Sequence, residues 1–369
     1  MMSRRRSRTA PGALVILAAV CLACSAPAAR PAAEGAAPPS ADTAAPSGGA
    51  QAPATVPERS EFRVLYGSVT GSMTPLWLAV EKGLFERYGL RPEVDYAEST
   101  VGTTAVSVGD AQLNVNEGVS ATRAIAAGSP LKIIAYFNKR NPYSIVARPE
   151  IVTPADLRGK AIALLRPGDT TDVSARIALK PRGIVLGEDV QPLSAGNSPS
   201  RLAALLSGQV AAALLSEAFV DQAVGQGMHV LISLEKEQLP YISTGVLINT
   251  SFGRESPNTV VAFLKAMIEG THLMADPANR DEVLPVMARK LKLDPADPAV
   301  ADAYDFYRER LARDPYPDRE GAETILDALR SIEPEIFASA TPEQMLDPSY
   351  MAAIRASGFL ESVWGQPVK

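Results

Sequence analysis

Three loops of this sequence place hydroxyl side chains and free backbone N–H groups directly before an expected helix. They span residues 67–73, 99–104 and 166–171. Such groups at a helix N-terminus bind anions and other polar ligands. A second interpretation stays open, in which each loop is an ordinary turn whose hydroxyls only cap the helix. The candidate ligand contacts in these loops are Ser68, Thr70, Gly71, Ser72, Met73, Thr100, Gly102, Thr103, Asp169, Thr170 and Thr171.

Two carboxylates stand where buried strands are expected to end. Asn116 and Glu117 follow one such strand and Ser216 and Glu217 follow another, so all four are candidate ligand contacts. The alternative is that each Glu only complements the dipole of the helix that follows it. An ionised Glu117 facing a ligand would favour hydrogen-bond donors over a simple oxyanion, because a carboxylate repels an anion.

The composition argues against most catalytic, metal-binding and nucleic-acid-binding functions. The chain has 369 residues, a formal net charge of −5 and only two His, His229 and His272. Both Cys lie near the N-terminus, at positions 21 and 24, so the body has no thiol nucleophile and no zinc–thiolate site. The acidic balance offers no footprint for nucleic acid, and the loops lack the glycine spacing of nucleotide-binding loops. We therefore expect no catalytic residue, no metal and no cofactor.

The elements that must position these residues alternate between strand and helix in two successive series. The first series has expected strands at 62–66, 93–97, 112–115 and 132–137. The second has expected strands at 161–165, 190–193, 211–215 and 229–234. Because helical segments separate the strands, this order predicts parallel sheets with helices packed on them. From residue 257 onward the sequence predicts mainly helices, at 259–274, 281–290, 298–313, 322–332 and 347–358.

Two further apolar stretches, 143–148 and 242–249, flank the second series and are expected to cross between two lobes. The predicted fold is an α/β clamshell in which residues 60–146 and 247–369 form lobe I and residues 147–246 form lobe II. The C-terminal helices are expected to pack on lobe I. Open α/β sheets bind ligands at the carboxyl ends of their strands, so we expect an interlobe cleft that closes by rotation about the crossover strands.

The N-terminus has the pattern of an export signal followed by a tether. An Arg-rich start precedes an apolar stretch at 13–23, which is too short to span a bilayer, and Cys21-Leu22-Ala23-Cys24 resembles a bacterial lipobox. We expect a lipoprotein signal peptide at 1–23 and lipidation of Cys24; a plain secretory signal is the alternative. Residues 24–59, rich in Ala and Pro, predict a disordered tether. The mature protein would then be exported to the cell envelope or periplasm and held at the membrane through its lipid alone.

Three motifs in the body resemble one protein family. Residues 76–90 read LWLAVEKGLFERYGL, residues 128–132 read GSPLK and residues 156–160 read DLRGK. These resemble segments of periplasmic solute-binding proteins of the nitrate/sulfonate/taurine type, a family shared with thiamine-precursor proteins. The resemblance implies a type II periplasmic-binding-protein fold and the receptor of an ABC importer. It also implies a small-molecule ligand, an ABC permease as partner and a monomeric protein.

Two other function classes stay open beside solute capture. Thiamine-pyrimidine synthases resemble this family, so an enzyme on the same scaffold is the runner-up. Those enzymes carry a Cys-rich segment and active-site His residues, whereas the body of this chain has no Cys and only two His. A ligand-sensing receptor without transport is the third class. The sequence leaves the ligand open among a sulfonate, nitrate, a carboxylate, an amine and a thiamine precursor.

Overall fold

The computed structural model describes residues 56–116 and 118–368, with only the backbone described for Ala218. Glu117, Cys24, the expected signal peptide and residues 24–55 of the expected tether lie outside the described residues. Residues 56–59 of that tether are described, and Glu58 and Arg59 pack on the folded body, contrary to the prediction. The Glu58 carboxylate accepts hydrogen bonds from the backbone N–H groups of Asn258 and Thr259, at 3.1 and 2.9 Å. The folded body therefore begins by Glu58.

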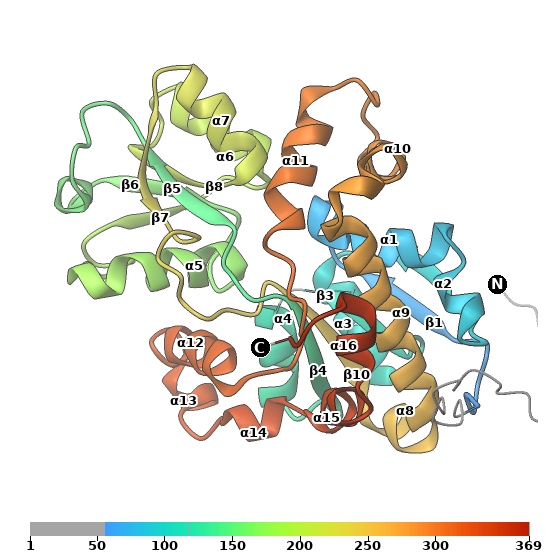
Figure 1. Ribbon diagram of the computed structural model, residues 1–369. Coiled ribbons are helices and arrows are strands. Elements are labelled where there is room, and N and C mark those ends of the chain that lie inside the picture. Colours follow the sequence, from blue (N-terminus) through green and yellow to red (C-terminus); the bar gives the residue numbers. More distant parts are fainter. Residues whose placement is uncertain (1–55, 117, 369) are drawn as a thin grey trace, which may run out of the picture. The chain divides into compact units, whose positions relative to one another are not determined.

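The first sheet has five strands in the order β2-β1-β3-β10-β4 (Figure 1). β1 pairs in parallel with β2 and β3, whereas β10 runs antiparallel to both β3 and β4. The strands are β1 (Arg63–Tyr66), β2 (Glu93–Tyr96), β3 (Leu113–Asn116), β4 (Leu131–Asn138) and β10 (Thr244–Asn249). The helices between them are α1 (Thr74–Glu81), α2 (Leu84–Arg87), α3 (Ser99–Val108) and α4 (Gly118–Ala126).

The second sheet repeats this arrangement with the order β7-β6-β8-β5-β9. β6 pairs in parallel with β7 and β8, and β5 runs antiparallel to β8 and β9. The two sheets thus have the same strand order and the same antiparallel fourth strand, which confirms the predicted two-lobed α/β fold. The strands are β5 (Tyr143–Ala147), β6 (Ala161–Leu164), β7 (Gln191–Ser194), β8 (Ala212–Ser216) and β9 (His229–Ser233). The helices are α5 (Thr170–Leu179), α6 (Ser198–Leu206) and α7 (Glu217–Gly225).

The two stretches that were expected to cross between the lobes are instead inner strands of one sheet each. β5 lies between β8 and β9, and β10 lies between β3 and β4. A strand inside a covered sheet is buried on both faces, so its sequence is an unbroken apolar run like that expected of a crossover. The chain passes between the sheets just before each strand, in residues 139–142 and 234–243. Residues 143–146 therefore belong to lobe II and residues 244–246 to lobe I, which corrects the predicted boundaries.

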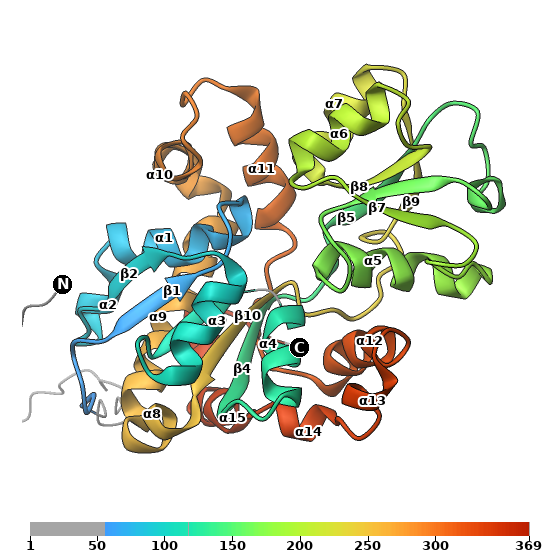
Figure 2. The same cartoon turned by 180° about the vertical axis from the view of Figure 1, so that it is seen from behind.

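The C-terminal third is helical, as predicted, and most of it packs on lobe I. The long helix α9 lies against α1, whereas α11 contacts α7 of lobe II and α12 contacts both α4 and α5 (Figure 2). Within residues 56–116 and 118–368, no helix combines the length and apolar character that crossing a membrane requires. The helices are α8 (Thr250–Glu255), α9 (Pro257–Ala275), α10 (Arg280–Leu291), α11 (Pro298–Arg308), α12 (Arg319–Arg330), α13 (Pro334–Phe337), α14 (Pro342–Met345), α15 (Ser349–Ala356) and α16 (Phe359–Trp364).

One buried apolar cluster runs through both lobes on the side where α12 lies. It includes Val119 of lobe I, Ile162 and Val173 of lobe II, and Ile325 and Leu329 of α12. Burial of each such side chain stabilises the fold by about 1.5–3 kcal/mol. Apolar packing therefore joins the two lobes on the α12 side. Elsewhere the facing surfaces of the lobes carry the polar residues described below.

Candidate functional site

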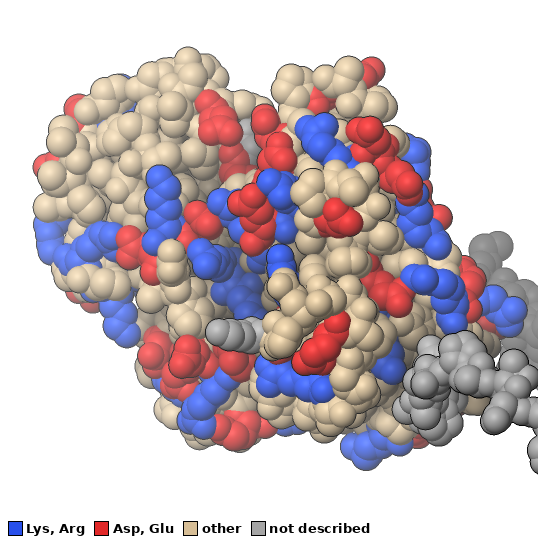
Figure 3. Space-filling view, in the orientation of Figure 1, with Lys and Arg blue, Asp and Glu red and all other residues tan. Residues whose placement is uncertain are grey.

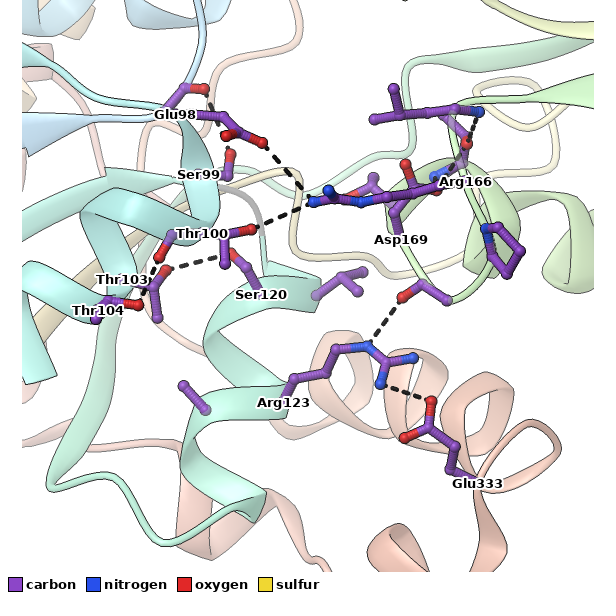
Figure 4. A pocket seen from close by; sticks show the side chains of 18 of the residues that line it. Glu98, Ser99, Thr100, Thr103, Thr104, Ser120, Arg123, Arg166, Asp169 and Glu333 are labelled. Carbon is purple, nitrogen blue, oxygen red and sulfur yellow. Dashed lines mark hydrogen bonds and ion pairs between the residues drawn. The ribbon is translucent and has the colours of Figure 1, made fainter. Parts of the chain in front are cut away.

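A cavity of about 660 Å³ lies where the carboxyl ends of the two sheets face each other. Its walls come from the loops after β2 and β6 and from the first turns of α3, α4 and α5. Hydroxyl groups, three carboxylates and two guanidinium groups share the lining with a few apolar side chains. The lining residues are Gly67, Glu98, Ser99, Thr100, Thr103, Thr104, Val119, Ser120, Arg123, Ala124, Tyr143, Leu165, Arg166, Pro167, Gly168, Asp169, Thr170, Thr171 and Glu333 (Figure 4).

The lobe I wall is fixed by Asn116, which ends β3. Its Nδ2 donates to the carbonyl of Ser99 at 3.0 Å and to the hydroxyls of Thr103 and Ser120 at 3.2 and 3.0 Å. Its Oδ1 accepts from the Ser99 hydroxyl at 2.6 Å. Gly67 is required beside it, because a Cβ there would lie 2.2 Å from Asn116 Oδ1. Asn116 is buried and holds the hydroxyls that line the cavity.

Arg123 of α4 connects lobe I to lobe II at the base of the cavity. Its Nε donates to the carbonyl of Gly168 at 2.9 Å, and its Nη1 pairs with Glu333 at 2.8 Å. Its guanidinium carbon lies 5.6 Å from the ring centre of Phe337. Gly168 has a φ of 75°, and a Cβ there would lie 2.7 Å from Arg123 Nη2. This arginine thus contacts the loop after β6 and the segment after α12 at once.

Arg166 reaches from lobe II across the cavity toward the start of α3 (Figure 4). Its Nη2 lies 3.4 Å from the Thr100 hydroxyl and 3.7 Å from a Glu98 carboxylate oxygen. More than half of each charged side chain is exposed, so this ion pair contributes little to stability. Arg166 is therefore free to exchange these partners for a ligand.

Asp169 caps α5 in the lobe II wall. Its Oδ1 accepts from the backbone N–H groups of Thr171 and Asp172 and from the Thr171 hydroxyl, at 2.7–3.0 Å. Its Oδ2 is buried and has no hydrogen-bond partner among the described residues. Burial raises the pKa of this carboxyl, partly opposed by the hydrogen bonds from Thr171. Oδ1 thus caps α5, as the alternative interpretation of this loop predicted. Oδ2 can accept a hydrogen bond from a ligand.

A second, smaller cavity of about 30 Å³ has Tyr143 as a wall in common with the large one. It is closed by Tyr307 of α11, whose hydroxyl donates to Glu217 Oε1 at 2.7 Å. Burial raises the pKa of Glu217, and Tyr307 opposes this by its hydrogen bond. Burial also raises the pKa of Tyr307 well above its ordinary value. The other lining residues are Ser68, Thr70, Ser72, Pro142, Ser216 and Ser243.

The candidate residues from the sequence thus fall into three groups. Thr100, Thr103, Asp169, Thr170 and Thr171 line the large cavity. Ser68, Thr70, Ser72, Ser216 and Glu217 line the small one.

The third group, Gly71, Met73, Gly102 and Asn116, lines neither cavity. Met73 is in the lobe I core, and Gly71 and Gly102 allow close approach of Tyr307 and Asn114. These four support the walls.

Sequence reasoning missed the residues that reach the cavities from distant elements. Arg123 stands alone on a helix, Glu333 follows α12, and Tyr307 is 90 positions from its partner Glu217. No local pattern marks these three. Glu98 directly precedes the candidate loop at 99–104. Its position at the carboxyl end of β2 was the one sequence signal that could have identified it as a lining residue.

Two further contacts tie the segments that cross between the lobes to their neighbours. Arg310 Nε donates to Glu235 at 3.0 Å, and Asn141 Nδ2 donates to the Ser174 hydroxyl at 2.8 Å. On the face of the molecule that Figure 3 shows, cationic and anionic side chains are interspersed. In the part of the chain that the structure describes, no group of three or more His, Cys, Asp or Glu is placed to hold a metal ion.

Solved structures with this architecture include several periplasmic binding proteins. The aliphatic sulphonate-binding protein SsuA from Escherichia coli is 20% identical with a TM-score of 0.64, over 79% of this chain and 93% of that one. The nitrate-binding protein NrtA from Synechocystis PCC 6803 is 16% identical with a TM-score of 0.62, over 84% and 90%. The alkanesulfonate-binding protein SsuA from Xanthomonas axonopodis pv. citri is 18% identical with a TM-score of 0.58, over 80% and 98%. No curated protein matches this chain.

The two sheets and the cavity between them define the fold of the periplasmic solute-binding proteins of ABC import systems. A family model described as "NMT1/THI5 like" matches residues 70–280, more than half of the sequence. The chain belongs to the NMT1/THI5-like family. This family includes enzymes as well as binding proteins, whereas the three structures compared above are binding proteins.

Proposed function

We propose that this protein is an extracytoplasmic solute-binding lipoprotein that captures a small molecule in the interlobe cavity and delivers it to an ABC importer. The observation that carries the proposal is the 660 Å³ cavity, whose lining comes from both lobes. Its walls present the N-terminus of α3, several hydroxyls and two arginines, which are donors suited to the polar end of a ligand. A volume of this size fits a small organic molecule.

The first test is a thermal-shift screen over small metabolites, followed by calorimetric titration of the hits. A ligand at 100 times its dissociation constant should stabilise the protein by about 2.7 kcal/mol. Arg166→Ala should weaken binding of an authentic hit, and Arg158→Ala, on the outer surface of lobe II, is the matched control. A screen in which no compound raises the melting temperature would contradict ligand capture.

Closure is tested by small-angle scattering. Because residues 139–142 and 234–243 are the connections between the sheets, the lobes should rotate about them when the hit binds. The radius of gyration should fall at saturating hit. An unchanged radius would show that binding needs no rotation of the lobes. Mass spectrometry of the recovered hit separates a binding protein, which returns it unaltered, from an enzyme.

Membrane attachment is tested at the N-terminus. Cys24→Ala should move the protein from the membrane fraction to the soluble fraction, because lipidation at this Cys supplies the acyl chains. Cys21→Leu, which brings the lipobox closer to its usual form, should leave attachment unchanged. A wild-type protein that fractionates as soluble would contradict the lipoprotein assignment.

Delivery to an importer is tested by uptake. Cells that lack this protein should lose accumulation of the labelled hit, and Cys24→Ala should restore it only partly. A permease recovered with the tagged protein would support transport over sensing. Unchanged uptake without the protein would favour a receptor that senses the ligand.

A further inference from the structure

The small cavity contains a carboxylate oxygen that the described residues leave without a donor. Glu217 Oε1 accepts from Tyr307, but Oε2 is fully buried and has no hydrogen-bond partner among the described residues. Burying an ionised carboxylate without a compensating donor is costly. Burial accordingly raises the pKa of Glu217. A donor that enters this cavity would remove the cost.

The rest of the small cavity is built to surround such a donor. Hydroxyl oxygens come from Ser68, Thr70 and Ser72 of lobe I, from Ser216 of lobe II and from Ser243 between the lobes. Each hydroxyl can accept as well as donate, so a group with several N–H bonds would find a partner for each. The volume of about 30 Å³ admits a group the size of one water molecule or one ammonium.

The large cavity has a different polarity. Arg123, Arg166 and the N-terminus of α3 contribute donors to its lining beside the carboxylates of Glu98, Asp169 and Glu333, whereas Asp169 Oδ1 already accepts from the first N–H groups of α5. Tyr143 forms a wall of both cavities, so the two are adjacent, and a ligand that extends past this side chain would have one end in each. Its end in the small cavity would meet a carboxylate, and its end in the large cavity would meet cationic and N–H donors.

We propose that the small cavity is the subsite for a primary ammonium group, and that the ligand is an amine-bearing molecule with its acceptor or anionic end in the large cavity. This inference rests on the proposed function. If it is correct, nitrate and sulfonates without an amine are not the ligand of this protein. Glu217 is then the specificity-determining residue, and Tyr307 positions its carboxylate.

The subsite is tested first with methylammonium chloride, because its ammonium group is of the size that the small cavity admits. Thermal stability is compared with that in tetramethylammonium chloride at equal ionic strength, because that cation is larger and has no N–H bond. Methylammonium should give the higher melting temperature in the wild type, and the difference should vanish in Glu217→Gln. Glu188→Gln, which removes an exposed carboxylate of the same lobe, should retain the difference. Equal melting temperatures of the wild type in the two salts would overturn the proposal.

The substrate class is tested with a matched pair of probes, 3-aminopropanesulfonate and propanesulfonate. The amine should bind the wild type about ten- to a hundredfold more tightly, the range of a charge-assisted hydrogen bond. Glu217→Gln should bring this ratio close to one. If propanesulfonate binds as tightly as the amine, the amine subsite is wrong while solute capture stands. If the metabolite screen also gives no ligand, both proposals fail together.

Discussion

The two cavities of this protein lie side by side but bury charge in different ways. In the large cavity, Arg123 has a hydrogen bond, an ion pair and a ring contact, and Arg166 is largely exposed. In the small cavity, Glu217 is buried with one donor for two carboxylate oxygens. A charge with several partners stabilises the lobe contact that it makes, whereas an under-partnered charge destabilises the empty site. The first cavity thus holds the lobes together through Arg123, and each cavity has one buried carboxylate oxygen without a donor, on Asp169 in the first and on Glu217 in the second.

The largest expected effect is that of Gly168→Ala at the base of the large cavity. Its backbone is left-handed and a Cβ would lie 2.7 Å from Arg123 Nη2, so the substitution strains the loop and displaces the arginine. We expect a loss of about 2–4 kcal/mol in the free energy of unfolding, measured by denaturant titration.

Gly183→Ala is the matched control for this prediction. Gly183 has a similar φ of 65°, and nothing lies within 4 Å of the added Cβ, so this change should cost only about 1–2 kcal/mol. If both variants lose the same free energy of unfolding, the contact between Arg123 and Gly168 contributes nothing to stability.

Tyr307→Phe should have the next largest effect, because it removes the one side-chain donor that Glu217 has among the described residues. We expect a destabilisation of about 1.5–3 kcal/mol near pH 7, the scale of a lost hydrogen bond to a charged group. The loss should be smaller near pH 4, where Glu217 is protonated. Thermal unfolding at both pH values measures it, with Tyr304→Phe on the same helix as the control. A loss that is the same at the two pH values would contradict the description of Glu217 as a buried charge.

Glu217→Gln should stabilise the ligand-free protein at neutral pH. Burial raises the pKa of Glu217, so the folded protein holds this proton more tightly than the unfolded chain does. Its contribution to stability is therefore present below the ordinary Glu pKa and is lost as pH rises. The variant should unfold like the wild type near pH 4 and be on the order of 1 kcal/mol more stable near pH 8. A variant less stable than the wild type near pH 8 would show that the carboxylate is satisfied in the empty site.

Arg166→Ala should have the smallest effect on stability. The ion pair of Arg166 with Glu98 spans 3.7 Å and is exposed at both ends, so its loss should cost at most about 0.5 kcal/mol. The melting temperature measures this. A large drop in melting temperature would mean that the ion pair between Arg166 and Glu98 also joins the lobes.

Most of the fold is predictable from the sequence because it depends on local patterns. Short apolar strands and amphipathic helices alternate along the chain, and nearly every expected strand lies within two residues of an observed one. β5 and β10 were misjudged for a physical reason. Burial on both faces removes the alternation that shows which sheet a strand belongs to.

The candidate site was only partly predictable because its charged residues act over long sequence distances. The hydroxyl loops at the strand ends were found, since position in the topology predicts them. Arg123 has the sequence context of an ordinary surface arginine on a helix, and its partners Gly168 and Glu333 lie 45 and 210 positions away. The division of the candidates into two cavities depends on Tyr307, which α11 brings in from the C-terminal third.

The position of β10 determines the order in which the two lobes can fold during synthesis. β3 and β4 do not pair with each other; β10 lies between them, and it comes from residues 244–249. A chain that emerges from the ribosome N-terminus first therefore exposes an interrupted first sheet while residues 143–233 already supply all five strands of the second. Pairings across such sequence separations form slowly, and unpaired strand edges invite aggregation. The lobe that begins first is the one completed last, so a factor that shields nascent strand edges would protect lobe I more than lobe II.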